Sequence, residues 1–138
     1  MTKFLLIVDY NGGVIDTPMT EWAPEEIKAH MEYYGALNEE LKANGELVET
    51  RALTGPELAK MVTSNGVNAP VVTDGPFLES KELLAGYQLV DVESEARAIE
   101  IAAKVSQVPG PGGVPLEQPI TVRRVMDDAD FEELNPLG

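Results

Sequence analysis

Residues 83–92 read Leu83-Leu84-Ala85-Gly86-Tyr87-Gln88-Leu89-Val90-Asp91-Val92, a segment of strand length that is apolar on both faces. Side chains alternate across a strand. One face is therefore expected to carry Leu83, Ala85, Tyr87 and Leu89, and the other Leu84, Val90 and Val92. A strand of this kind needs a packed layer on each side. Helices can cover one face of a small antiparallel sheet, so the sequence predicts that a different layer covers the other.

The flanking sequence supplies two helices and further strands. Pro24 fits the first position of a helix that ends at Asn44-Gly45, with an apolar stripe at three- and four-residue spacing. Ser94 is a plausible N-cap for a second helix, from Glu95 to about Val105. Apolar or alternating runs predict the other strands at residues 3–10, 47–53, 58–64, 67–73 and 120–126. Asn65-Gly66 predicts a tight hairpin between two of them.

The order of these elements predicts the fold. Without the hairpin it is βαββαβ, an α+β ferredoxin-like unit with both helices on one face of the sheet. The other face is then apolar and open. Burying it against a second copy would give a homodimer, a dimeric α+β barrel. We expect one domain over residues 1–126 and an acidic C-terminal tail over residues 127–138.

Charge and composition exclude several classes of function. The 138 residues contain 24 Asp and Glu against 10 Lys and Arg, a net charge of −14. This balance argues against nucleic acid and against anionic membrane surfaces as partners. The chain has no cysteine, no apolar run long enough to span a membrane and no signal-peptide pattern at its start. We therefore expect a cytoplasmic domain without disulfides or thiolate chemistry.

The segment Asp74-Gly75-Pro76-Phe77-Leu78-Glu79-Ser80-Lys81-Glu82, followed by Gly86-Tyr87, resembles the signature of the YCII-related proteins that carry the DGPF motif. The likeness extends to the opening strand at residues 3–7, to the end of the first helix at residues 38–45, and to a Pro/Gly loop and closing strand at residues 109–125. The prolines and glycines of residues 108–119 by themselves predict a loop there. It implies a dimeric α+β barrel, in a superfamily that includes cofactor-free enzymes for small organic molecules. It also implies a link to extracytoplasmic-function sigma factors, which some relatives have.

The same resemblance implies a histidine on the first helix, paired with an acidic residue. Here His30 is the only histidine, and it lies about one turn earlier than the family position. Tyr34 occupies the place nearer to that position. Both side chains are candidates for a site, His30 as a catalytic group and Tyr34 as a contact to the ligand.

The turn residue Asp74 is a candidate general base or ligand anchor. An aspartate in a turn usually accepts a hydrogen bond from the N–H two residues on. That residue is Pro76, which has no N–H. The carboxylate must find another partner or remain available, although it can equally cap the segment that follows. Glu79 and Lys81, two residues apart, are further catalytic candidates, or else an ordinary surface ion pair.

Phe77, Tyr34 and Tyr87 complete the candidate site as contacts to a substrate. No metal site is expected, because the chain has one histidine, no cysteine and no calcium-loop spacing. No cofactor motif is present either. The favoured hypothesis is a cofactor-independent enzyme, isomerase- or lyase-like, acting on a small polar organic molecule between the first helix and the sheet. The alternatives are a metabolite-binding or regulatory module that contacts a sigma factor, and a purely structural motif.

Overall fold

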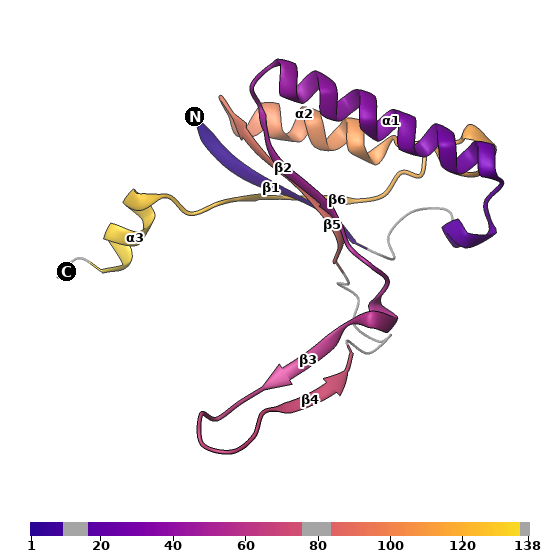
Figure 1. Cartoon of the computed structure of the whole chain (residues 1–138). Helices are drawn as coiled ribbons and strands as arrows, with labels where there is room; N and C mark the ends of the chain where they lie inside the picture. The colour runs from indigo at the N-terminus through magenta and orange to yellow at the C-terminus, as the bar shows by residue number, and fades with distance from the viewer. Residues whose placement is uncertain (10–16, 76–83, 136–138) are drawn as a thin grey trace.

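A four-stranded antiparallel sheet forms the centre of the molecule (Figure 1). The structure is a computed structural model and describes residues 1–9, 17–75 and 84–135. The strand order is β2-β5-β1-β6. The strands are β1 (Thr2–Asp9), β2 (Leu47–Ala52), β5 (Leu84–Val92) and β6 (Ile120–Arg124). With two helices between them, this arrangement confirms the predicted ferredoxin-like α+β fold.

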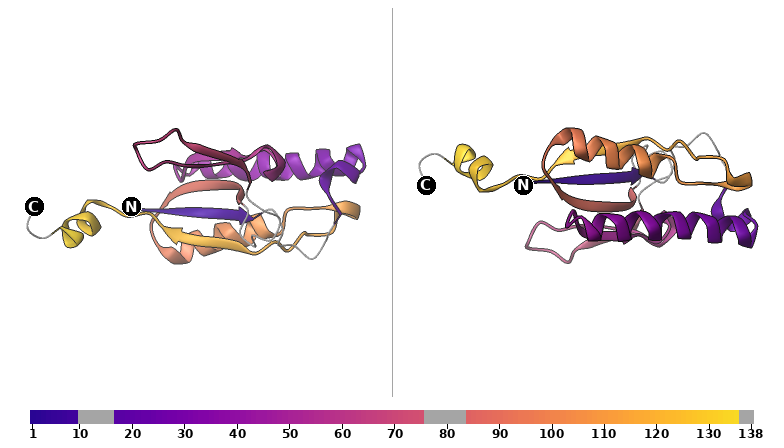
Figure 2. Two further views of the ribbon diagram at one scale, coloured as in Figure 1. Left: turned by 90° about the horizontal axis from the view of Figure 1, so that it is seen from below. Right: turned by 90° about the horizontal axis from the view of Figure 1, so that it is seen from above.

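Both long helices cover the same face of the sheet (Figure 1), and both run along its strands (Figure 2). The first, α1 (Pro24–Ala43), begins at the predicted proline and ends beside Asn44. The second, α2 (Glu95–Ser106), begins at the predicted cap, where the Ser94 hydroxyl accepts a hydrogen bond from the Arg97 N–H. The Tyr33 hydroxyl ties the two helices together, because it donates to the Lys104 carbonyl at 2.6 Å.

The core lies between these helices and the sheet. Its fully buried members include Leu6, Leu41 and Ile101. Each such side chain contributes about 1.5–3 kcal/mol relative to an exposed position. On β5 the alternate residues from Gly86 to Val92 face this core. Leu84 was expected on the same face but is 42% exposed, at the first position of β5, where the pairing with β1 also shifts register between Val8 and Asp9.

The Pro/Gly-rich loop at residues 108–119 is packed against the start of α1. Val108 and Leu116 are buried in a second apolar cluster with Trp22. Within the loop, a 3₁₀ turn, η3 (Pro111–Gly113), places Gly112 at a φ of 70°, a conformation that glycine adopts without steric cost. The loop therefore closes one end of the space between α1 and the sheet.

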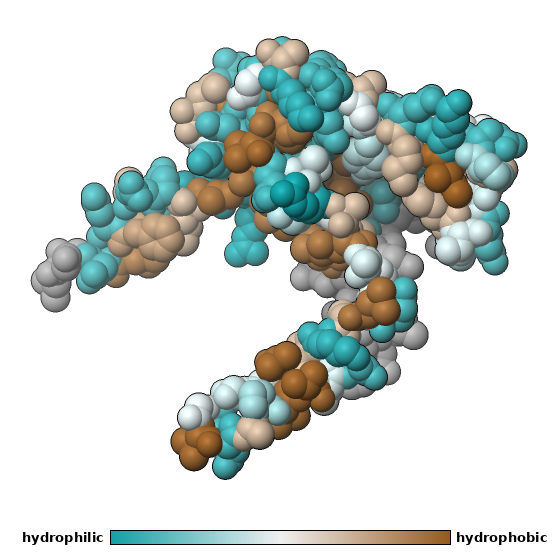
Figure 3. All heavy atoms as spheres, in the orientation of Figure 1, coloured by the Kyte–Doolittle hydropathy of each residue, from teal (hydrophilic) through white to brown (hydrophobic). Residues whose placement is uncertain are grey.

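A hairpin of β3 (Lys60–Thr63) and β4 (Val71–Asp74) extends away from this body (Figure 1), and Figure 3 shows apolar side chains on its surface. All residues of both strands are exposed. The arms are shorter than the predicted ranges 58–64 and 67–73. The prediction of a tight turn at Asn65-Gly66 was wrong. The strands are joined by a wider loop, in which the Asn65 carboxamide oxygen accepts hydrogen bonds from the N–H groups of Val67 and Asn68.

The C-terminal segment contains a short helix, α3 (Asp128–Leu134), which projects from the body beyond the N-terminus (Figure 2). The last strand stops at Arg124, two residues before the predicted end. Asp127 caps the helix by accepting from the Asp130 N–H at 3.0 Å. Among the described residues, no helix is both long enough and apolar enough to cross a membrane.

Candidate active site

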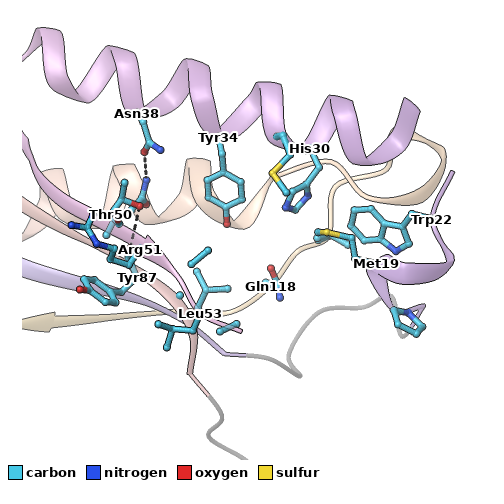
Figure 4. A pocket seen from close by; sticks show the side chains of 18 of the residues that line it. Met19, Trp22, His30, Tyr34, Asn38, Thr50, Arg51, Leu53, Tyr87 and Gln118 are labelled. Atoms are coloured by element: carbon cyan, nitrogen blue, oxygen red, sulfur yellow. Dashed lines mark hydrogen bonds between the residues drawn. The ribbon is translucent and has the colours of Figure 1, made fainter. Parts of the chain in front are cut away.

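A cavity of about 1050 Å³ lies between α1 and the sheet (Figure 4). This volume lies just above the range of about 300–1,000 Å³ that small-molecule sites occupy. Its apolar walls come from Val8, Met19, Trp22, Met31, Leu53 and Leu116. Its polar groups come from His30, Tyr34, Asn38, Thr50, Arg51, Tyr87, Gln88 and Gln118. An apolar cavity with a few convergent polar groups is the usual form of a ligand site.

His30 is the central titratable group of this cavity. The side chain is only 7% exposed. Its Nδ1 lies 2.9 Å from the Pro109 carbonyl oxygen. A carbonyl can only accept, so Nδ1 carries the proton and Nε2 of the neutral ring keeps a free lone pair. Burial lowers the pKa of His30 below its ordinary value of 6.5, although the hydrogen bond to Pro109 opposes this shift. The neutral tautomer with a basic Nε2 therefore predominates at pH 7.

Tyr34 lies one helical turn from His30 and points into the same space (Figure 4). The two ring centroids are 5.2 Å apart, and Trp22 packs edge-on against the other side of His30 at 5.3 Å. Burial raises the pKa of the Tyr34 phenol to about 12. The hydroxyl stays protonated at neutral pH and receives no hydrogen bond from another described residue. It is a donor placed beside a base.

The carboxylate of Glu26 holds the Pro/Gly-rich loop against α1. It accepts from the Ala23 N–H at 2.8 Å and from the Gly112 N–H. These two hydrogen bonds, that of Gly112 above all, lower the pKa of Glu26. Pro109, the hydrogen-bond partner of His30, lies in the same loop, so Glu26 helps to hold the segment that contacts the imidazole.

The sheet side of the cavity is set by Gly86 and Gln88 on β5. The buried Gln88 side chain donates to the Asn38 carboxamide oxygen at 2.6 Å, which joins β5 to α1. A Cβ on Gly86 would lie 2.9 Å from the Arg51 carbonyl oxygen of the neighbouring strand. Only glycine allows β2 and β5 to approach this closely beside the cavity.

Arg51 and Tyr87 mark the end of the cavity opposite Trp22 (Figure 4). Arg51 Nη1 donates to the Thr50 carbonyl at 2.8 Å, and Nη2 lies 3.3 Å from the Glu49 carboxylate. The Tyr87 hydroxyl donates to the other Glu49 oxygen at 3.0 Å. This hydrogen bond is the main reason that the pKa of Tyr87 is raised.

Three of the predicted site residues, His30, Tyr34 and Tyr87, are among the described residues that line the cavity. His30 and Tyr34 are in contact on α1, whereas Tyr87 lies at the other end and its hydroxyl is bonded to Glu49. Asp74 is not among the residues that line the cavity. It ends the exposed hairpin, where it forms an ion pair with Lys60. Its proposed catalytic role stays a prediction.

Three other candidates, Phe77, Glu79 and Lys81, lie outside the described residues. Within the described ranges, no group of three or more His, Asp or Glu side chains could hold a metal ion.

Sequence reasoning missed Trp22, Arg51 and Gln118 as members of the site. Trp22 lies in none of the predicted helices or strands, and its single occurrence in the chain was the only available signal. Arg51 lies within the strand predicted at residues 47–53, and no local pattern marks it as part of a site. Gln118 follows the prolines of the loop, and no local pattern marks it.

The fold and the cavity define a small ferredoxin-like α+β protein with a ligand-sized site between its first helix and its sheet. The model of the YCII-related domain family matches residues 2–115, so the chain belongs to that family. An uncharacterized protein of Rhizobium meliloti (strain 1021) is 31% identical over 85 residues. That alignment covers 62% of this chain and 68% of the relative.

Proposed function

We propose that the protein is a cofactor-independent enzyme, isomerase- or lyase-like, that moves a proton on a small polar organic molecule in this cavity. One observation carries the proposal. The Pro109 carbonyl fixes His30 as the tautomer whose Nε2 is basic, beside a phenol that stays protonated. A base and a donor in one apolar site suit abstraction of a proton next to a carbonyl, with the phenol stabilising the charge that develops.

The experiment has two stages. A thermal-shift screen against a metabolite library first identifies compounds that stabilise the folded protein. Each of these is then incubated with the protein in D₂O, and mass spectrometry measures deuterium incorporation into the compound. The proposal expects exchange that falls at least about 100-fold in His30→Gln while binding is retained. Tyr34→Phe should lower the exchange rate without removing it.

Undiminished exchange in His30→Gln would contradict the role of the imidazole. Binding with no exchange and no turnover would instead support the alternative, a metabolite-binding module without catalysis. The expectation of a sigma-factor-type partner rests on the family resemblance alone. It stays a prediction, as does the cytoplasmic location.

We also propose that the protein forms a homodimer through the face of the sheet that the helices leave open. The paired residues Leu5 and Leu89, and next to them Ile7 and Tyr87, form the middle of this face. All four are half-buried in a single copy. A second copy would complete their burial, and this supports the predicted dimer.

A further inference from the structure

The β3–β4 hairpin is exposed on both faces in a single copy of the chain. A single two-stranded hairpin is marginally stable at best in water, and it needs further strands or a helix to pack against. Residues 58–74, which contain this hairpin, form an arm. Its large apolar side chains that are more than half exposed are Leu58, Met61, Val62, Val67, Val71 and Val72. We therefore expect another surface to cover the arm.

The register of the hairpin gives the arm an apolar pair on each face. Val62 is directly opposite Val72 on one face. Side chains alternate along a strand, so Met61 and Val71 lie on the other face, diagonally across from each other. A sheet with one solvated face normally carries polar residues there. Neither face of the arm has this pattern.

The arm is electrically neutral in a strongly acidic chain. Its charged residues are Lys60 and Asp74, and these form an ion pair with each other. The whole net charge of −14 therefore lies on the remaining residues. Two acidic copies repel each other, and a high net charge favours the monomer. A neutral, apolar arm can contact a second copy without adding to this repulsion.

The arm lies on the side of the sheet that the helices leave open (Figure 1). It follows β2 in the chain, and β2 is one edge of the sheet, whereas β6 is the other. Figure 3 shows an open space between the arm and the body of the molecule. Two packed sheets lie about 10 Å apart. A second copy seated on the open face would therefore enter this space, with an edge of its sheet beside the arm.

We propose that the arm packs against a second copy of the chain, along the edge of its sheet, and holds the two copies together. By two-fold symmetry each copy gives one arm and receives one. The inference rests on the homodimer proposed above and adds to it a second contact, outside the open face. This contact covers the apolar side chains that a single copy leaves exposed on the arm.

Sedimentation at a series of protein concentrations measures the dissociation constant of the dimer. Two double variants, Val62→Thr with Val72→Thr and Met61→Thr with Val71→Thr, each change one face of the arm, and threonine favours strands as valine does. At least one of them should raise the dissociation constant at least about tenfold, because a hydroxyl buried without a partner opposes packing. Val114→Thr is the control, since Val114 is 53% exposed and lies outside the arm. Circular dichroism of each variant checks that the fold is kept.

Hydrogen exchange measures the burial of the arm directly. The N–H groups of residues 60–63 and 71–74 should exchange more slowly in the dimer than in Leu89→Glu, where a charge in the middle of the open face separates the copies. Equal exchange in the two proteins, or double variants that dimerise as tightly as Val114→Thr, would overturn the role of the arm and leave the dimer in place. A monomeric unsubstituted protein, or a Leu89→Glu variant that stays dimeric, would overturn the open-face dimer and this inference with it.

Discussion

At the scale of the residue, His30 derives its chemistry from its surroundings. The ring is buried between Trp22 and Tyr34, and one nitrogen is committed to a backbone carbonyl. Burial disfavours the charged form more than the hydrogen bond favours it, so the folded state holds a weaker base than free histidine. Because its pKa lies below 6.5, the imidazole is mainly neutral at pH 7 and can accept a proton.

This shift predicts a pH dependence of stability. In the unfolded chain His30 titrates near pH 6.5, and in the folded chain its pKa is lower. Between the two values the unfolded state binds more protons, so the free energy of unfolding rises with pH across that window. The contribution of His30 to the free energy of unfolding is fully present above about pH 6.5 and is lost as the pH falls from 6.5 to the pKa of the folded state.

NMR can follow the titration directly, because the chain has a single histidine and therefore one Cε1–H signal. We expect a midpoint below 6.5. In denaturant melts over the same pH range, His30→Gln should show a flatter dependence of stability than the unsubstituted protein. A midpoint at or above 6.5 would contradict the proposed neutral imidazole.

The sequence placed His30 on the first predicted helix, and the structure confirms this position on α1. Helical spacing puts residues 30, 34 and 37 near one face, so the neighbourhood of His30 and Tyr34 could be predicted. The burial of His30 could not be predicted, because it depends on Pro109, which lies 79 residues further along the chain. No spacing rule connects a proline-rich loop to a particular imidazole.

At the scale of the element, the Pro/Gly-rich loop is the part that completes the site. The sequence predicted a loop at residues 108–119 but said nothing of where it packs. The structure shows that Glu26 binds the Gly112 N–H at the start of α1, while Leu116 is buried against the same helix end. The loop is thus fixed to the start of α1 at two points.

Removing the hydrogen bond between Glu26 and the Gly112 N–H should loosen the loop. In Glu26→Ala the Gly112 N–H loses its acceptor, so its hydrogen exchange should become faster. The loop would then hold Pro109 less firmly over His30 and admit more water. We expect the pKa of His30 to rise toward its ordinary value of 6.5. Hydrogen exchange and the NMR titration measure the two effects.

Glu25→Ala is the matched control. Glu25 is a carboxylate in the same first turn of α1, and it is exposed. Its removal changes the net charge and the helix-dipole interaction to the same degree. If the two variants raise the pKa of His30 equally, the lost negative charge is the cause, and the proposed effect of the loop is contradicted.

At the scale of the whole molecule, the four-stranded sheet is covered on one side and open on the other. The open face has apolar side chains in its middle and charges at its edges. Along one row, Glu49 on β2 is opposite Leu89, Leu89 is opposite Leu5, and Leu5 is opposite Arg123 on β6. The two edges of the row therefore carry opposite charges.

A two-fold axis parallel to the strands would bring the β2 edge of one copy over the β6 edge of the other. Glu49 would then approach Arg123 of the partner subunit, and the two apolar middles would meet. The sequence predicted this need for a second layer from residues 83–92 alone. It could not indicate the axis, because the register of β2 and β6 against their neighbours is set by the folded sheet.

Light scattering coupled to size-exclusion chromatography should give twice the mass of one chain. Leu89→Glu places a charge in the apolar middle and should dissociate the dimer. Ile99→Glu is the control, since Ile99 is 55% exposed on α2, in the helical layer on the other side of the sheet. Reversing Arg123 to Glu should weaken the dimer, and adding Glu49→Arg should restore it under this axis. A monomer in the unsubstituted protein would overturn the assembly and leave the apolar middle of the sheet facing water.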